Sequence, residues 1–131
     1  AAGRKAAEAD YRLALEAVKT MLTRVAEGPL AKDFAFRAAR ETLLRDADEF
    51  YTKLIEAHPD AATAYAGRGR VRELLAEFPA ARADARRAVE LAPDEARWHF
   101  RLGMIPGGDW ADAVGHLERA VALAPNEVEY Y

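Results

Sequence analysis

The side chains that could support chemistry in this chain are few and widely spaced. Its three histidines are His58, His99 and His116. They show no His-Glu-x-x-His arrangement and no spacing typical of a zinc pair carried by one helix. We therefore expect solvated or partly buried histidines, and we expect no metal and no other cofactor.

A short acidic cluster is formed by Asp46, Asp48 and Glu49. A calcium loop would need more oxygen ligands, a glycine turn and a terminal Glu. Because the cluster falls inside a predicted helix, we expect it to be a solvated helix face.

The segment Gly67-Arg68-Gly69-Arg70 has a composition that could contact phosphate or RNA. It lies within a predicted helix, however, and Gly69 suits a position where two helices touch, so a packing role is the better interpretation. No Ser-His-Asp arrangement with a supporting local motif is visible. The chain also has no cysteine, which excludes thiol catalysis and cysteine-ligated metals. The sequence therefore predicts that the chain is not an enzyme.

The bulk properties exclude further classes. A net charge of −3 over 131 residues argues against a nucleic-acid partner, which would need a basic face. No apolar run approaches the roughly 18 residues of a membrane span, and no secretory signal is visible. The absence of cysteine fits a reducing compartment, so we expect a cytoplasmic location. Frequent alanine favours an all-α fold. Because the chain begins without Met, we expect a fragment of a longer protein.

The positioning elements begin with two long helices, over about residues 5–26 and 33–57. The first carries one apolar stripe and is stopped by Gly28-Pro29. The second contains no Gly or Pro, so we expect one uninterrupted helix. The stripe of the first helix is Tyr11, Leu15, Val18, Leu22 and Val25. The main stripe of the second is Phe36, Leu43, Ala47, Phe50 and Leu54, with Leu44, Tyr51 and Ile55 alongside. The two helices predict a long antiparallel hairpin over residues 1–58.

The second half of the chain is organised by proline. Pro59, Pro93 and Pro125 stand at intervals of 34 and 32 residues, which is typical of a repeated helix pair. We expect a unit over residues 59–93, with helices at 62–76 and 79–91. A shortened unit over residues 94–125 follows, with helices at 95–104 and 110–123, and residues 126–131 begin a truncated further repeat. Asp94 and Asp109 are the predicted N-caps.

Two residues are missing around Pro106, and proline interrupts helical hydrogen bonding. The first helix of the second unit should therefore be one turn short and end before Pro106.

From Pro59 onward the chain resembles the tetratricopeptide repeat. The matching residues of the first unit are Tyr65, Gly69, Phe78, Ala81, Ala88 and Pro93. Those of the second are Leu102, Gly103, Gly108, Trp110, Ala113, Ala120 and Pro125. The first unit departs from the motif at Arg68, Arg72 and Ala76, where Leu, an aromatic residue and a turn Gly are usual. The resemblance implies a single all-α domain: a tetratricopeptide-like α–α superhelix preceded by the long helical hairpin.

Such repeats bind partners on the inner face of the first helix of each unit. By motif offset, the exposed inner positions are Thr63, Ala66, Arg70, Glu73, Arg97, Phe100, Arg101 and Met104. Arg97 and Arg101 share a helix face and resemble one basic pair of the carboxylate-clamp subfamily, which grips a peptide C-terminus. The other clamp positions hold Gly67, Ala66 and Arg70. A solvated Arg pair balanced by Asp94 and Glu95 is the alternative.

Residues 8–57 resemble a stretch that follows the kinase domain in bacterial Hanks-type serine/threonine kinases and leads into tetratricopeptide repeats. The segments Asp10–Val18, Met21–Val25 and Arg45–Tyr51 carry this resemblance. No kinase motif is present, so the resemblance implies a non-catalytic, kinase-associated extension.

Together these features predict a protein–protein interaction module, a scaffold or peptide binder from a larger bacterial signalling protein. We expect a protein or peptide partner of acidic character, and neither nucleic acid nor membrane. The alternative is a structural module that self-associates through its open C-terminal edge, where the last helix leaves an apolar side uncovered.

Overall fold

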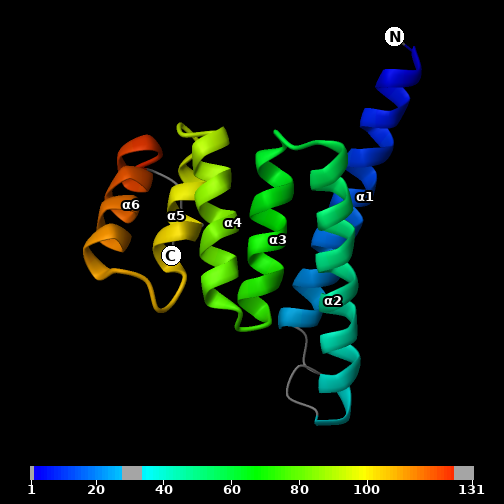
Figure 1. Ribbon diagram of the computed structural model, residues 1–131, viewed down its shortest axis with the longest axis horizontal. Helices are drawn as coiled ribbons and strands as arrows, with labels where there is room; N and C mark the ends of the chain where they lie inside the picture. Colours follow the sequence, from blue (N-terminus) through cyan, green and yellow to red (C-terminus); the bar gives the residue numbers. More distant parts are fainter. Residues whose placement is uncertain (1, 28–33, 126–131) are drawn as a thin grey trace. The chain divides into compact units, whose positions relative to one another are not determined.

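The computed structural model describes residues 2–27 and 34–125, with side chains from 11 to 24 and from 36 to 125. These residues form six α-helices and no strand (Figure 1). The helices are α1 (Ala2–Glu27), α2 (Phe34–Ala57), α3 (Ala62–Leu74), α4 (Phe78–Leu91), α5 (Ala96–Met104) and α6 (Trp110–Leu123). The all-α prediction is confirmed. The predicted connection at Gly28-Pro29 and the predicted further repeat at 126–131 lie outside the described residues.

The chain forms two compact units, residues 1–47 and 48–131, and the boundary between them falls inside α2. The sequence predicts a boundary after residue 58, between the helical hairpin and the repeats, and that boundary stays a prediction.

In unit 1, α1 buries Leu15 and Leu22 from the predicted stripe. The second helix is continuous from Phe34 to Ala57, as its lack of Gly and Pro predicted. Its most deeply buried residues are Leu44, Ala47 and Tyr51, whereas Phe36, Leu43, Phe50 and Leu54 are only partly buried. Of the predicted main stripe, Ala47 is buried, whereas the neighbouring Leu44 and Tyr51 are buried more deeply than Leu43 and Phe50.

Unit 2 contains the two repeated helix pairs. Helix α3 packs on α4, α4 packs on α5, and α5 packs on α6. Within each pair a glycine allows the close approach, as the motif predicted. A Cβ added at Gly69 would lie 3.2 Å from the Ala81 carbonyl oxygen, and one at Gly103 would lie 3.0 Å from that of Ala113. A Cβ at either position would require its neighbours to shift, so glycine favours the close approach of the paired helices.

The shortening of the second unit falls where it was expected. Helix α5 has 9 residues against 13 in α3, and it ends at Met104, two residues before Pro106. Gly107 has φ of +81°, a left-handed conformation that glycine adopts without cost. The Arg82 guanidinium Nη1 donates a hydrogen bond of 2.6 Å to the Pro106 carbonyl, which ties this loop to α4.

Helix ends were predicted less well than helix bodies. The residue at the N-cap of α5 is Glu95, so the prediction for Asp94 is wrong. Asp109 does occupy the N-cap of α6, but its side chain makes no capping hydrogen bond there.

Helix α3 stops at Leu74, two residues earlier than predicted, and Ala76 follows with φ of +60°. The Ala76 N–H donates to the Glu73 carbonyl at 2.9 Å, and the Glu77 N–H donates to the Arg72 carbonyl at 2.8 Å. This pair of bonds is the Schellman ending of a helix, which normally has glycine at the left-handed position.

Candidate binding groove

A groove opens in unit 2 where three helices meet. Its lining residues come from α3, α4, α5 and the residue that follows α5. They are Ala66, Gly69, Arg70, Glu73, Ala85, Ala88, Trp98, Arg101 and Ile105. The space is about 270 Å³, counting its open mouth. Because this volume includes open solvent, it describes a depression in the surface and not an enclosed ligand cavity.

The groove combines an apolar floor with charged groups. Ala85 and Ala88 are buried, and the Trp98 indole and Ile105 add apolar surface from the α5 side. Arg70 contributes a guanidinium that forms an ion pair with Glu73 at 3.3 Å, and Arg101 contributes a second guanidinium from α5. The lining residues therefore carry two positive charges and one negative charge.

The structure brings together only part of the predicted inner face. Ala66, Arg70, Glu73 and Arg101 line the groove. Thr63, Arg97, Phe100 and Met104 are not among its lining residues. Arg97 instead pairs with Glu95 at 3.2 Å, as the alternative interpretation of the Arg pair expected, and its guanidinium lies 4.9 Å from the centre of the Trp98 ring.

This division has a geometric cause. A groove between two neighbouring repeats is lined by one side of the first helix of one repeat and by the facing side of the first helix of the next repeat. The motif offset selected Arg97, Phe100 and Met104, which stand at the positions of Thr63, Ala66 and Arg70 in α3 and do not line the groove. The side of α5 that faces the groove carries Trp98 and Arg101, and Ile105 follows just past the end of the helix, at spacings of three and four residues. Sequence reasoning missed Trp98 and Ile105, although this helical spacing from Arg101 would have indicated both.

A second group of charged side chains lies inside unit 2 between α2, α3 and α4. Arg68 donates from Nε and Nη2 to the two carboxylate oxygens of Asp84, and Arg72 contacts the same carboxylate at 3.1 Å. Arg72 also donates to Asp48 at 2.9 Å, while Arg68 donates to the Thr52 hydroxyl at 3.3 Å. Asp84 is buried, so this group acts in packing between the helices.

Two sequence interpretations are settled by this network. Asp48 was expected on a solvated face; that is wrong, because its carboxylate is largely buried against Arg72. Asp46 and Glu49 are exposed, as expected. The packing interpretation of the Gly-Arg-Gly-Arg segment is supported, because Arg68 is held by Asp84 and a Cβ at Gly67 would overlap the Tyr51 ring.

Two of the histidines meet between α5 and α6. His99 Nδ1 and His116 Nδ1 are 3.2 Å apart, and His99 Nε2 is 2.7 Å from the Pro93 carbonyl oxygen. A carbonyl only accepts, so Nε2 of His99 carries the hydrogen, and Nδ1 of neutral His99 accepts from Nδ1–H of His116. Burial lowers the pKa of His116; Asp112 opposes this shift, whereas His99 and Arg86 add to it. His116 is partly buried, as expected, but His99 is buried, so the expectation of solvated or partly buried histidines is wrong for His99. The contact between the two rings was not predicted.

Within residues 2–27 and 34–125, no group of three or more His, Asp or Glu side chains is placed to hold a metal ion. A search of the helices over the same residues finds none with the length and apolar character needed to cross a membrane.

Comparison with known proteins bears on the fold. No protein-family model matches the chain, and no curated protein matches it. Among solved structures, a mutant of the O-GlcNAc transferase of Thermobaculum terrenum, a protein of tetratricopeptide type, is similar with a TM-score of 0.62 and 23% sequence identity. The chain has a tetratricopeptide-like fold. The match covers 86% of this chain and 20% of the transferase, so the chain spans about a fifth of that protein's length.

In the terms of this fold, α3 and α5 are the first helices of two repeats, and α4 and α6 are the second helices. The groove therefore lies where two successive first helices approach each other over the intervening α4.

Proposed function

We propose that the chain is a non-catalytic protein-interaction module whose groove holds a short acidic peptide segment. The observation that carries this proposal is the composition of the groove: an apolar floor beside the guanidinium groups of Arg70 and Arg101. An apolar side chain of the peptide would occupy the floor, and a neighbouring carboxylate would contact the arginines.

The chemistry of the rim favours a carboxylate as the charged group. A guanidinium presents two parallel N–H donors that match the two oxygens of a carboxylate. Arg70 is held beside Glu73, and Arg101 brings a second guanidinium to the groove from α5. Trp98 adds a flat apolar surface beside Arg101, and aromatic and Arg side chains are the residues most often found to dominate binding energy.

The same reasoning extends to the setting of the module. A tetratricopeptide-like fold and the resemblance of residues 8–57 to a kinase-associated extension support a regulatory part of a larger bacterial signalling protein in the cytoplasm. The similar transferase is a much longer chain, which supports a helical-repeat region working within a larger protein.

Binding to defined peptide pools tests the proposal. One pool contains short peptides with a leucine flanked by Asp or Glu, and the matched pool has Lys at the acidic positions. Trp98 lies in the groove, so quenching of its fluorescence reports occupancy, with Trp110 replaced by Phe to remove the second tryptophan. Saturable quenching by the acidic pool alone is expected. Equal quenching by both pools, or by neither, would contradict the proposal.

A further inference from the structure

The charges of the groove are arranged unequally on its two walls. On the α3 wall, Arg70 and Glu73 lie about one turn apart and form an ion pair. Of the residues that line the groove from α5, Arg101 is the one that carries a charge. The α3 wall is therefore neutral overall and presents a carboxylate, whereas the α5 wall presents a guanidinium. A ligand that carried carboxylates alone would be attracted to the α5 wall and repelled by part of the α3 wall.

The register of the two helices places these charges one after another along the groove. Gly69 of α3 and Gly103 of α5 hold equivalent positions, since each faces the carbonyl oxygen of an alanine in the second helix of its pair. Figure 1 shows that α3 and α5 run in the same direction. Arg101 precedes Gly103 by two residues, and Glu73 follows Gly69 by four. Glu73 therefore lies toward one end of the groove and Arg101 toward the other, with Arg70 between them.

The Glu73 carboxylate can accept more than its contact with Arg70. That contact is 3.3 Å long and is made by Oε1, while a carboxylate has about four acceptor sites on its two oxygens. The Glu73 side chain is 21% exposed, so it is more shielded from water than a carboxylate on an open surface. Solvent and salt screen the attraction of a partly buried pair less than that of an exposed pair. A basic side chain of a ligand would therefore be stabilised beside Glu73.

We propose that Glu73 is the specificity-determining residue of the groove, and that it selects a peptide with an acidic residue on one side of an apolar residue and a basic residue on the other. This inference rests on the proposed function and defines the class of peptide more closely. The apolar residue lies on the floor formed by Ala85 and Ala88. The acidic residue faces Arg101, and the basic residue faces Glu73. A second acidic residue in place of the basic one would meet the Glu73 carboxylate and be repelled.

Three peptide pools test this inference. Two are the acidic pool and its matched Lys pool. The third, the mixed pool, has Lys at the acidic position on one side of the leucine only, in separate peptides of both orders. Affinity is measured by quenching of Trp98 fluorescence in the chain with Trp110→Phe. The mixed pool should bind about threefold more tightly than the acidic pool, which is the scale expected of one partly exposed ion pair.

A charge-neutral variant then assigns the preference to Glu73. Glu73→Gln keeps the shape of the side chain and removes its charge. In this variant the mixed pool should bind more weakly and the acidic pool more tightly, so the acidic pool should become the preferred ligand.

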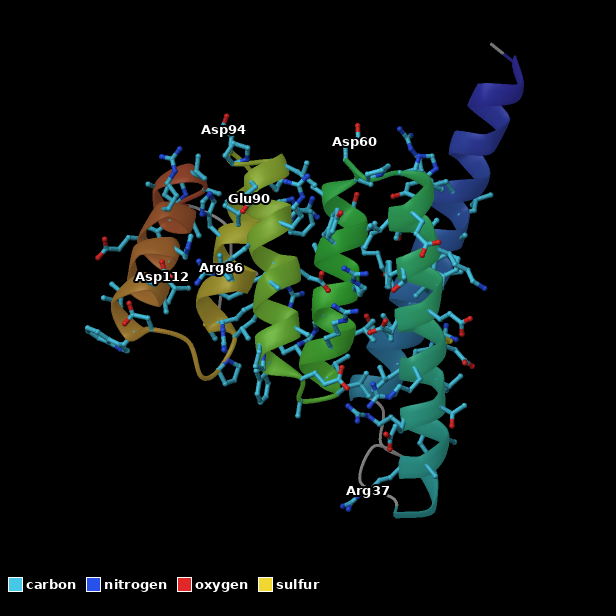
Figure 2. The ribbon with its side chains drawn as sticks, in the orientation of Figure 1. Arg37, Asp60, Arg86, Glu90, Asp94 and Asp112 are labelled. Carbon is cyan, nitrogen blue, oxygen red and sulfur yellow. The ribbon has the colours of Figure 1, made fainter. Side chains whose placement is uncertain are left out.

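Glu90→Gln is the matched control. Glu90 forms the same kind of pair with Arg87, three residues before it, at 3.1 Å. It lies in the last turn of α4, where Figure 2 labels it, and it is not among the lining residues of the groove. Because Glu90→Gln makes the same change in net charge, it should keep the mixed pool as the preferred ligand if the preference arises from contact with Glu73.

The outcomes separate this inference from the proposed function. Equal or tighter binding of the acidic pool by the unchanged chain would overturn the inference and leave the proposed function standing. A preference for the mixed pool that persists in Glu73→Gln, or that is lost equally in Glu90→Gln, would also overturn it. Binding of neither the acidic nor the mixed pool, or tightest binding of the Lys pool, would contradict the proposed function and this inference together. Circular dichroism of both variants confirms that the helices are retained.

Discussion

Arg68 and Asp84 form a two-pronged ion pair inside unit 2, with Nε–Oδ2 and Nη2–Oδ1 distances of 2.9 and 2.7 Å. The hydrogen bonds to Asp84 raise the pKa of Arg68 above its ordinary value and keep the guanidinium charged. Arg68 stands where the tetratricopeptide motif has leucine, and Arg72 stands where it has an aromatic residue. In this repeat, a polar layer has replaced an apolar contact between helices.

Removal of the shared carboxylate should be costly. Asp84→Ala leaves Arg68 and part of Arg72 without their acceptor in a mostly buried site, and we expect the free energy of unfolding to fall by about 3 kcal/mol. Restoring the motif residue should recover part of that loss, since an apolar replacement of a buried pair is often close to neutral. The double variant Arg68→Leu/Asp84→Ala should therefore be more stable than Asp84→Ala alone in urea denaturation.

The control for this prediction is Asp112→Ala. Asp112 pairs with Arg86 through side chains that are about half exposed, so its loss should cost less than about 1 kcal/mol. A double variant that is less stable than Asp84→Ala would show that Arg68 is stabilising without its partner, contrary to this account.

The turn after α3 is expected to gain stability from glycine. Ala76 has φ of +60° between two hydrogen bonds that fix the turn, and a Cβ makes this conformation unfavourable. Ala76→Gly should raise the free energy of unfolding by about 1 kcal/mol, once the greater freedom of glycine in the unfolded chain is included.

Ala83→Gly is the matched control, because Ala83 is exposed in the middle of α4. There the same substitution should lower stability by about 1 kcal/mol. If both substitutions lower stability in thermal or urea denaturation, Ala76 is not strained in the folded protein.

The fold was more accessible from sequence than the groove. Helix bodies follow from apolar periodicity, and the shortened α5 follows from the two residues missing at Pro106, because both signals are local. The groove depends on which sides of α3 and α5 approach each other, and that is decided by packing between repeats. The contact of His99 with His116, 17 positions along the chain, likewise arises only when α5 and α6 pair. Asp48 and Arg72 show the same limit, since each alone has the appearance of a surface charge.

The histidine pair makes the stability of unit 2 depend on pH. Burial lowers the pKa of His116 in the folded chain, so the unfolded chain binds the proton more readily. This contribution to stability is complete above the unfolded pKa of about 6.5 and is lost as pH falls through the lowered folded pKa.

Urea denaturation between about pH 8 and about pH 5 measures this effect, a range that avoids most carboxylate titration. His116→Asn keeps an N–H donor near the place of Nδ1 and cannot be protonated there. The unchanged chain should lose stability over this range by more than the variant does. Equal slopes for the two proteins would remove His116 as the cause.

The last prediction separates the two arginines of α5. Arg101 lines the groove, whereas Arg97 pairs with Glu95 and is not among the lining residues. Arg101→Glu should reduce affinity for the acidic peptide pool at least about tenfold, since it replaces an attractive charge with a repulsive one. Arg97→Glu, four residues away on the same helix, makes the same change in net charge and should alter affinity by no more than about threefold. The difference between the variants, measured by isothermal titration with helical content checked by circular dichroism, reports local contact. Equal losses of affinity would indicate that the peptide responds only to overall charge. A larger loss of affinity for Arg97→Glu would place binding on the side of α5 that carries Arg97.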